Sequence, residues 1–92
     1  MVRCIRLCVT GQVQGVGYRA WAIATAARLG LRGWVRNRAD GSVEALVIGD
    51  DETVAAMVAS CRDGPPAARV RDVAVAEAAD DGSTGFTARP SA

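Results

Sequence analysis

The chain alternates between two spacings of apolar residues, one typical of strands and the other of helices. Apolar and polar residues alternate from Arg3 to Thr10, as in a strand with one buried face. From Tyr18 to Leu29 the apolar side chains recur every three or four residues, and Gly30 follows where helices commonly end. The first third of the chain is therefore predicted to be a strand, a glycine-containing loop and a helix.

The remaining residues predict a hairpin, a second helix and one or two further strands. The hairpin turn, Arg38-Ala39-Asp40-Gly41, ends in glycine, and Gly64-Pro65-Pro66 ends the second helix. The predicted strands are 31–37, 42–48, 69–76 and a short one at 86–89, and the second helix is predicted from Asp50 or Asp51 to Cys61.

This order, β-α-β-β-α-β, predicts a ferredoxin-like α+β sandwich: one antiparallel sheet with both helices on one face. Residues 1–92 are expected to form a single domain, because the sequence has no internal repeat or low-complexity segment. Trp21, Met57 and Val58 lie on helical stripes and are predicted core residues. Trp34 is predicted to pack rather than to contact a ligand.

Composition excludes several classes of protein. The net charge of +1 argues against broad nucleic-acid binding. No apolar run reaches the roughly 18 residues that a membrane span requires, and residues 1–6 lack the apolar stretch of a signal peptide. We therefore expect a soluble, cytoplasmic protein. The absence of His removes the commonest general base and the commonest metal ligand.

The three cysteines are predicted to be free thiols. Cys4 and Cys8 would lie on one face of the same strand, roughly 13 Å apart at about 3.3 Å per residue. A disulfide requires Cα atoms within roughly 7 Å, so this pair cannot close. Free thiols suit a reducing cytosol.

The segment between the first strand and the first helix is the strongest candidate for a binding site. It reads GQVQGVGYR, from Gly11 to Arg19. Glycines allow left-handed backbone angles that point successive N–H groups into one concavity, and a helix N-terminus adds unpaired donors and partial positive charge. Arg19 can bind two phosphate oxygens. The segment therefore predicts a phosphate site.

Three other interpretations of this segment are possible. Residues 15–20 formally match the dinucleotide fingerprint GxGxxG/A, but that fold needs parallel βαβ repeats, and here the second strand enters a hairpin. A Walker loop fails because no GK[ST] follows. A glycine-rich turn without a ligand remains open on this segment alone.

Asn37 becomes a candidate through topology. Alone, an asparagine at a hairpin is more often a turn residue than a catalyst. In the predicted sheet, however, the first and second strands are parallel and separated only by the third, so their C-terminal ends are about 10 Å apart on one sheet edge. The loop follows one end and Asn37 lies at the other, which leaves room for a phosphate and a water.

Two segments, GQVQGVGYR and GWVRNRADGSVE, resemble the two signatures of the acylphosphatase family, and they occur at its usual separation. The resemblance covers almost the whole chain. It implies a metal-independent hydrolase that acts on a small-molecule acyl phosphate without a cofactor. We separately expect a monomer and, from the composition, no nucleic-acid or membrane partner. Arg19 matches the arginine that binds phosphate and Asn37 the asparagine that positions water. The loop whose backbone donors hold the phosphate is matched by Gln14, Gly15, Val16, Gly17, Tyr18 and Arg19.

The sequence departs from the family pattern at two places. Arg38 stands where some members carry Thr, so a hydroxyl contact is absent there. Some members rest the terminal carboxylate on the catalytic arginine, and Pro90-Ser91-Ala92 after Arg89 put that support in doubt. Asp50, Asp51 and Glu52 are interpreted as a helix start rather than a metal site, and Arg69 and Arg71 as solvated strand residues.

Two rival functions are known for domains of this fold. The first is a phosphate-binding or carbamoyl-phosphate-binding module without turnover of its own, because a similar domain occurs inside hydrogenase-maturation carbamoyltransferases. The second is a ferredoxin-like RNA-binding module. Such modules stack bases on sheet aromatics, but the predicted strand 42–48 contains none.

Overall fold

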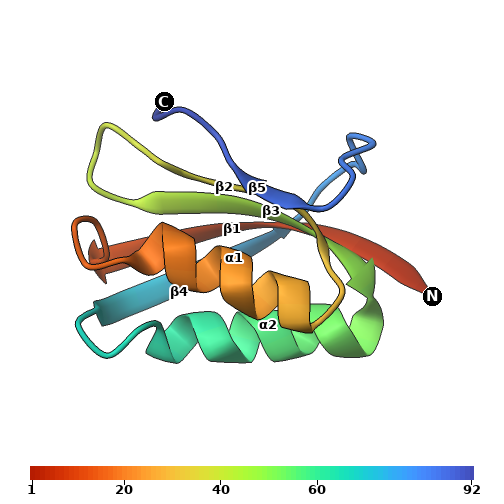
Figure 1. Ribbon diagram of the computed structural model, residues 1–92, viewed down its shortest axis with the longest axis horizontal. Coiled ribbons are helices and arrows are strands. Elements are labelled where there is room, and N and C mark those ends of the chain that lie inside the picture. Colours follow the sequence, from red (N-terminus) through yellow and green to blue (C-terminus); the bar gives the residue numbers. More distant parts are fainter.

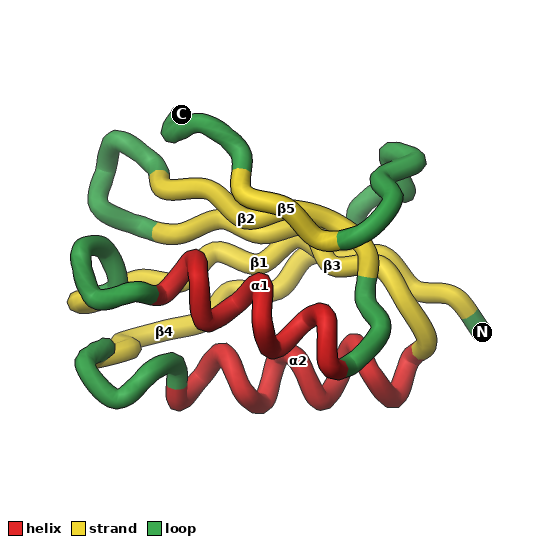
Figure 2. The backbone as a smooth tube through the Cα atoms, viewed as in Figure 1, coloured by secondary structure: helices red, strands yellow, loops and turns green.

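The computed structural model describes residues 1–92. One five-stranded sheet has the order β4-β1-β3-β2-β5, and two helices cover one of its faces (Figures 1 and 2). The predicted element order and the ferredoxin-like fold are confirmed. The elements are β1 (Val2–Gln12), α1 (Tyr18–Arg28), β2 (Arg32–Asn37), β3 (Val43–Asp50), α2 (Asp51–Asp63), β4 (Arg69–Glu77) and β5 (Phe86–Ala88).

The sheet is mixed, which corrects the prediction of a purely antiparallel one. β5 pairs in parallel with β2, with Trp34 opposite Thr87, whereas the other neighbours are antiparallel. β4 and β5 lie at opposite edges of the sheet. The loop of residues 78–85 therefore reverses the chain and crosses the sheet, so β5 runs in the same direction as β2.

The main core lies between the sheet and the two helices. Ile5, Leu7 and Val9 of β1 face it, and Val54 and Met57 of α2 pack from the other side; all five are essentially inaccessible. Fully burying such a side chain contributes roughly 1.5–3 kcal/mol. The prediction that Met57 is a core residue is confirmed, and Trp21 and Val58 pack against the same cluster while partly exposed.

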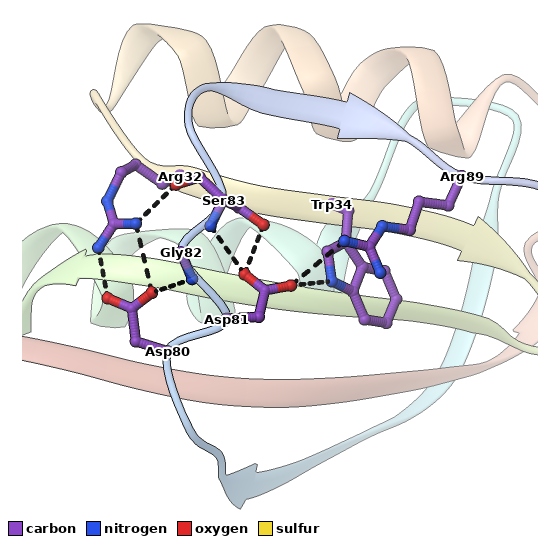
Figure 3. Close-up of polar contacts among 7 residues, drawn as sticks. All are labelled: Arg32, Trp34, Asp80, Asp81, Gly82, Ser83 and Arg89. Atoms are coloured by element: carbon purple, nitrogen blue, oxygen red, sulfur yellow. Dashed lines mark hydrogen bonds and ion pairs between the residues drawn. The ribbon is translucent and has the colours of Figure 1, made fainter.

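The opposite face of the sheet carries a second, smaller apolar cluster under the loop of residues 78–85. Trp34, Leu46 and Ile48 form it, and Trp34 is only 5% exposed. Asp81 of the loop accepts a hydrogen bond from the Trp34 indole N–H at 3.1 Å (Figure 3). Trp34 therefore packs, as predicted, and its ring is not available to a ligand.

β1 and β2 run in the same direction with β3 between them, as the sequence predicted. The loop of residues 13–17 and the hairpin turn of residues 38–42 therefore emerge at one end of the molecule, on the left in Figure 1. Edge strand β4 begins at the same end, and its register with β1 shifts between Thr10 and Gly11, leaving Arg71 without a partner. This shift is a β-bulge.

Candidate active site

Two glycines shape the loop that leads from β1 into α1. Gly15 has φ 73° and Gly17 has φ 80°, in the left-handed region. A Cβ at either position would meet nothing within 4 Å. The requirement for glycine there therefore comes from the backbone angle and not from lack of space.

The N-terminus of α1 is free of competing acceptors. Its N-cap is Gly17, no side chain caps it, and its first turn contains no acidic residue. The N–H groups of residues 14–17 also donate to no acceptor within the protein. Unpaired donors and the helix dipole together make an anion-binding position.

Buried side chains anchor both ends of this loop. Val13 and Tyr18 are 1% and 3% exposed. The Tyr18 hydroxyl donates to the Cys61 carbonyl at 2.7 Å, and its ring meets Trp21 edge-on at 5.2 Å between centroids. Because its side chain is committed to the core, Tyr18 can offer only its backbone to a ligand.

The Arg19 side chain has no partner within the protein. It is exposed and makes no hydrogen bond or ion pair. With Gly15, Gly17 and Tyr18 it lines a pocket of about 420 Å³, which Ile23 and Ala88 help to close. The structure therefore brings the predicted loop and the predicted phosphate-binding arginine together.

Asn37 is the last residue of β2 and lies at the same sheet edge, but it does not line that pocket. Its side chain is half-buried and makes no hydrogen bond to the protein. Its backbone is held on both sides, by Val43 of β3 and by the Ala92 N–H, which donates to the Asn37 carbonyl at 3.0 Å. The amide group is therefore free on a fixed backbone.

The C-terminal residues continue along β2 as far as the hairpin. The Arg89 N–H donates to the Val35 carbonyl at 2.9 Å, and the Ala92 carbonyl accepts from Ala39 at 2.7 Å. Arg89 also lies 4.8 Å from the Trp34 ring centroid. These residues support the backbone around Asn37 and make no polar contact with Arg19.

A role for the Gln14 side chain had not been predicted. Its amide donates to the carbonyls of Arg38 and Ser42, both at 2.8 Å, and so joins the loop to the hairpin. Only its backbone was predicted to take part in the site, because no local pattern reveals a contact across 24 residues. The Arg38 guanidinium points instead toward Glu44, at 3.8 Å.

Glu44 is a buried carboxylate held by arginines on the sheet face opposite the helices. Its side chain is 4% exposed, and Arg36 and Arg6 approach it at 2.7 and 3.5 Å. Arg36 also lies over Trp34, at 4.9 Å from the ring centroid. Glu44 therefore stabilises the base of the hairpin and is not available as a catalytic base.

The cysteines are free, as predicted, and two are poor nucleophiles. Burial raises the pKa of the Cys61 thiol to about 11. Burial, followed by the nearby Asp80 and Asp81, raises the pKa of Cys4. Since the thiolate is the reactive form, neither is suited to covalent catalysis at neutral pH.

The structure offers neither a metal site nor a membrane-spanning helix. No group of three or more His, Cys, Asp or Glu side chains is placed to hold a metal ion, and neither helix has the length and apolarity to span a membrane.

A larger cavity of about 860 Å³ lies at the other end of the molecule. Its lining carries three carboxylates, Asp51, Glu52 and Glu77, against one guanidinium, Arg3, and this excess of negative charge would repel an anionic substrate.

Together, the fold and the loop define a ferredoxin-like domain that presents an uncapped helix N-terminus beside an unpaired arginine. The acylphosphatase family model matches residues 5–88. The chain belongs to the acylphosphatase family.

Relatives and solved structures agree with this assignment. An acylphosphatase of Rhodospirillum rubrum is 54% identical over 90% of this chain and 91% of its own length. One of Rhodopseudomonas palustris is 60% identical over 79% of this chain and 74% of its own. The crystal structure of the Bacillus subtilis acylphosphatase superposes with a TM-score of 0.91 at 36% identity, covering 97% of this chain and 99% of that one. The predicted hydrolase class is confirmed, and the binding-module alternative is not favoured.

Proposed function

We propose that this chain hydrolyses acyl phosphates to a carboxylate and inorganic phosphate at the edge formed by the 14–19 loop and Asn37. The observation that carries the proposal is the uncapped, acid-free N-terminus of α1 beside the unpaired Arg19. Backbone N–H groups of residues 14–19 hold the phosphate, Arg19 pairs with its oxygens, and Asn37 orients the attacking water. The chain acts as a monomer on a small-molecule substrate.

The chemistry of the substrate explains why so few groups suffice. An acyl phosphate expels a carboxylate whose conjugate acid has a pKa near 4, so the leaving group departs without a general acid. The absence of His from the chain is therefore no obstacle. The proton of the attacking water passes to the phosphate itself, as the family resemblance implies.

Phosphoryl transfer depends mainly on positioning and on stabilisation of charge spread over the equatorial oxygens. Fixed N–H donors and one guanidinium supply this stabilisation without reorganising during the reaction. The α1 dipole acts in the same direction, since no acidic side chain in its first turn offsets it.

Asn37 suits the water-orienting role because its amide has both a donor and an acceptor. Neither is used by the protein, and the backbone is fixed by pairing on both sides. A carbonyl that accepts from water and an amide that donates to it hold the nucleophile in one orientation, which lowers the entropic part of the barrier.

The test is a metal-free assay of benzoyl phosphate hydrolysis. Removing one preorganised donor typically costs 10²–10³ in rate, about 2.7–4 kcal/mol. We expect Arg19→Ala to lose more than this, because phosphate affinity and turnover fall together. Arg28→Ala is the matched control, since Arg28 is an exposed, unpaired arginine in the last turn of the same helix, and it should retain full activity.

Asn37→Ala should lower kcat by about 10²–10³ and leave the affinity for inorganic phosphate nearly unchanged. Full turnover with weakened phosphate binding would show that Asn37 holds phosphate rather than water. A well-folded wild type without any turnover would instead favour the module that binds phosphate or carbamoyl phosphate without reaction.

A further inference from the structure

The Gln14 side chain forms the only polar side-chain link between the phosphate loop and the hairpin that follows Asn37. One nitrogen, Nε2, lies 2.8 Å from both the Arg38 and the Ser42 carbonyl oxygens. Each carbonyl also accepts a hydrogen bond within the hairpin. The Ser42 carbonyl accepts from the Arg38 N–H at 2.9 Å, and the Arg38 carbonyl accepts from the Gly41 N–H at 3.1 Å. Gln14 therefore uses the second lone pair of each oxygen, and both N–H donors of its amide are engaged.

This link joins the ends of two strands that are not neighbours in the sheet. The loop continues β1 and Asn37 ends β2, and these strands are not neighbours because β3 lies between them. Arg38, whose carbonyl Gln14 binds, directly follows Asn37. The loop itself contains two left-handed glycines, Gly15 and Gly17, and glycine restricts the backbone less than any other residue. A direct tie to the hairpin removes that freedom.

We propose that Gln14 is a positioning residue whose carboxamide sets the spacing between the phosphate cradle and the water held by Asn37. The inference rests on the proposed functions of the loop, which binds phosphate, and of Asn37, which orients water. Arg19 and the loop donors move together when the link is lost, so phosphate binding survives. Asn37 then no longer stands at the right distance from the phosphorus. A misplacement of about 1 Å can cost roughly 10² in rate.

The first test separates turnover from affinity. Gln14→Met keeps the length of the side chain and removes both donors. We expect kcat for benzoyl phosphate to fall roughly 10²-fold, while the affinity for inorganic phosphate, measured by calorimetry, stays close to wild type. Gln12→Met is the matched control, because Gln12 is exposed two residues earlier and makes no side-chain hydrogen bond; it should retain wild-type kcat. An unchanged kcat in Gln14→Met, or a parallel fall of kcat and phosphate affinity, would overturn the proposal.

The second test uses pH. In Gln14→Glu an ionised carboxylate would face two carbonyl oxygens and repel them, whereas the protonated acid has one O–H and can restore one of the two bonds. The unfavourable contact raises the pKa of the new carboxyl above its usual value of about 4.3. The kcat of Gln14→Glu should therefore rise, relative to wild type at the same pH, as the pH is lowered through that pKa. A ratio of variant to wild-type kcat that stays constant across the pH range would contradict the role of the Gln14 amide as a donor.

A third measurement does not depend on acyl phosphate hydrolysis. Hydrogen exchange at the Arg38 and Gly41 N–H groups should be faster in Gln14→Met than in wild type and in Gln12→Met, because the turn loses its tie. Circular dichroism checks that each variant is folded. If wild type hydrolysed no acyl phosphate, the proposed function would fail, and this exchange would still decide whether Gln14 holds the hairpin. Unchanged exchange rates at these N–H groups in Gln14→Met would overturn the proposed link between Gln14 and the hairpin.

Discussion

Tyr18 supplies a hydrogen bond that the sequence of α2 cannot make. The Cys61 carbonyl belongs to the last turn of that helix, and the residue four positions later is Pro65, which has no N–H. The Tyr18 hydroxyl donates to this carbonyl instead. Burial raises the pKa of Tyr18 well above its usual value, so the hydroxyl keeps its proton and donates at neutral pH.

Removing this donor should destabilise the fold. In Tyr18→Phe the buried Cys61 carbonyl is left unpaired, which costs about 1–3 kcal/mol in the free energy of unfolding. Urea denaturation measures this cost. Ser60→Ala is the control, because it removes a hydroxyl of α2 that has no hydrogen-bond partner and should change stability little. Equal stabilities of Tyr18→Phe and wild type would mean that water replaces the donor.

Some site residues could be predicted from the sequence because local signals mark them. Glycine spacing before a helical pattern indicated the loop and Arg19, and the parallel course of two strands indicated Asn37. The contacts of Gln14 and Tyr18 carry no such signal, since each joins segments at least 24 residues apart. Such partners become visible only when the packing of the elements is known.

At the scale of elements, the loop of residues 78–85 determines how the outer sheet face is closed. Arg32 is held to Asp80 at 2.6 Å, and Asp81 binds the Ser83 hydroxyl and the Trp34 indole (Figure 3). The sequence predicted a loop at 80–85 and a short strand at 86–89, but neither the crossing of the sheet nor the parallel pairing of β5 with β2. Residues 80–85 are polar and glycine-containing and have no periodicity, so nothing in them indicates that the chain crosses the sheet. The regular elements, by contrast, followed from their apolar spacing.

These carboxylates should make the loop sensitive to acid. The hydrogen bond and charge of Arg32 lower the pKa of Asp80, and hydrogen bonds from Ser83 lower that of Asp81. A lowered folded-state pKa means that the stabilisation is complete above the unfolded-state value, near 4, and is lost as pH falls through the folded-state value. Tm should therefore decrease below about pH 4.

Asp80→Asn should reduce the slope of Tm against pH in this acidic range. Asp72→Asn is the control, because Asp72 is exposed and has no side-chain partner. Identical slopes in wild type and Asp80→Asn would mean that the Arg32 pair contributes nothing to acid sensitivity. Thermal unfolding followed by circular dichroism between about pH 2 and pH 6 measures the effect.

For the whole molecule, charge is separated along the strand direction although the net charge is only +1. The end that carries the loop and Asn37 holds Arg19, Arg36, Arg38, Arg62, Arg69 and Arg71, against Asp40, Glu44, Asp63 and Asp72. The other end holds Asp50, Asp51, Glu52, Glu77 and Asp80, against Arg3, Arg28 and Arg32. Arg89 and Asp81 pair with each other at 3.3 Å and add to neither end. An anionic substrate is therefore attracted to one end and repelled from the other.

This asymmetry predicts a salt-dependent kcat/KM. Raising the ionic strength from about 0.01 to 1 M shortens the Debye length from roughly 30 to 3 Å, so kcat/KM for benzoyl phosphate should fall. The double variant Arg69→Gln/Arg71→Gln should have a lower kcat/KM at low salt, a weaker salt dependence and an unchanged kcat. Arg28→Gln, at the opposite end, should not lower kcat/KM. Parallel salt profiles of the double variant and wild type would exclude steering by these arginines.

The bulged edge strand β4 has a consequence for the behaviour of the protein at high concentration. A free sheet edge is a template on which a second molecule can add its own strand. Here the edge carries Arg69, Arg71, Asp72 and Glu77, all exposed, and its regular hydrogen-bonding pattern is interrupted at Arg71. Guanidinium groups and an interrupted ladder both oppose intermolecular strand pairing, so the shape of this edge protects the protein against aggregation.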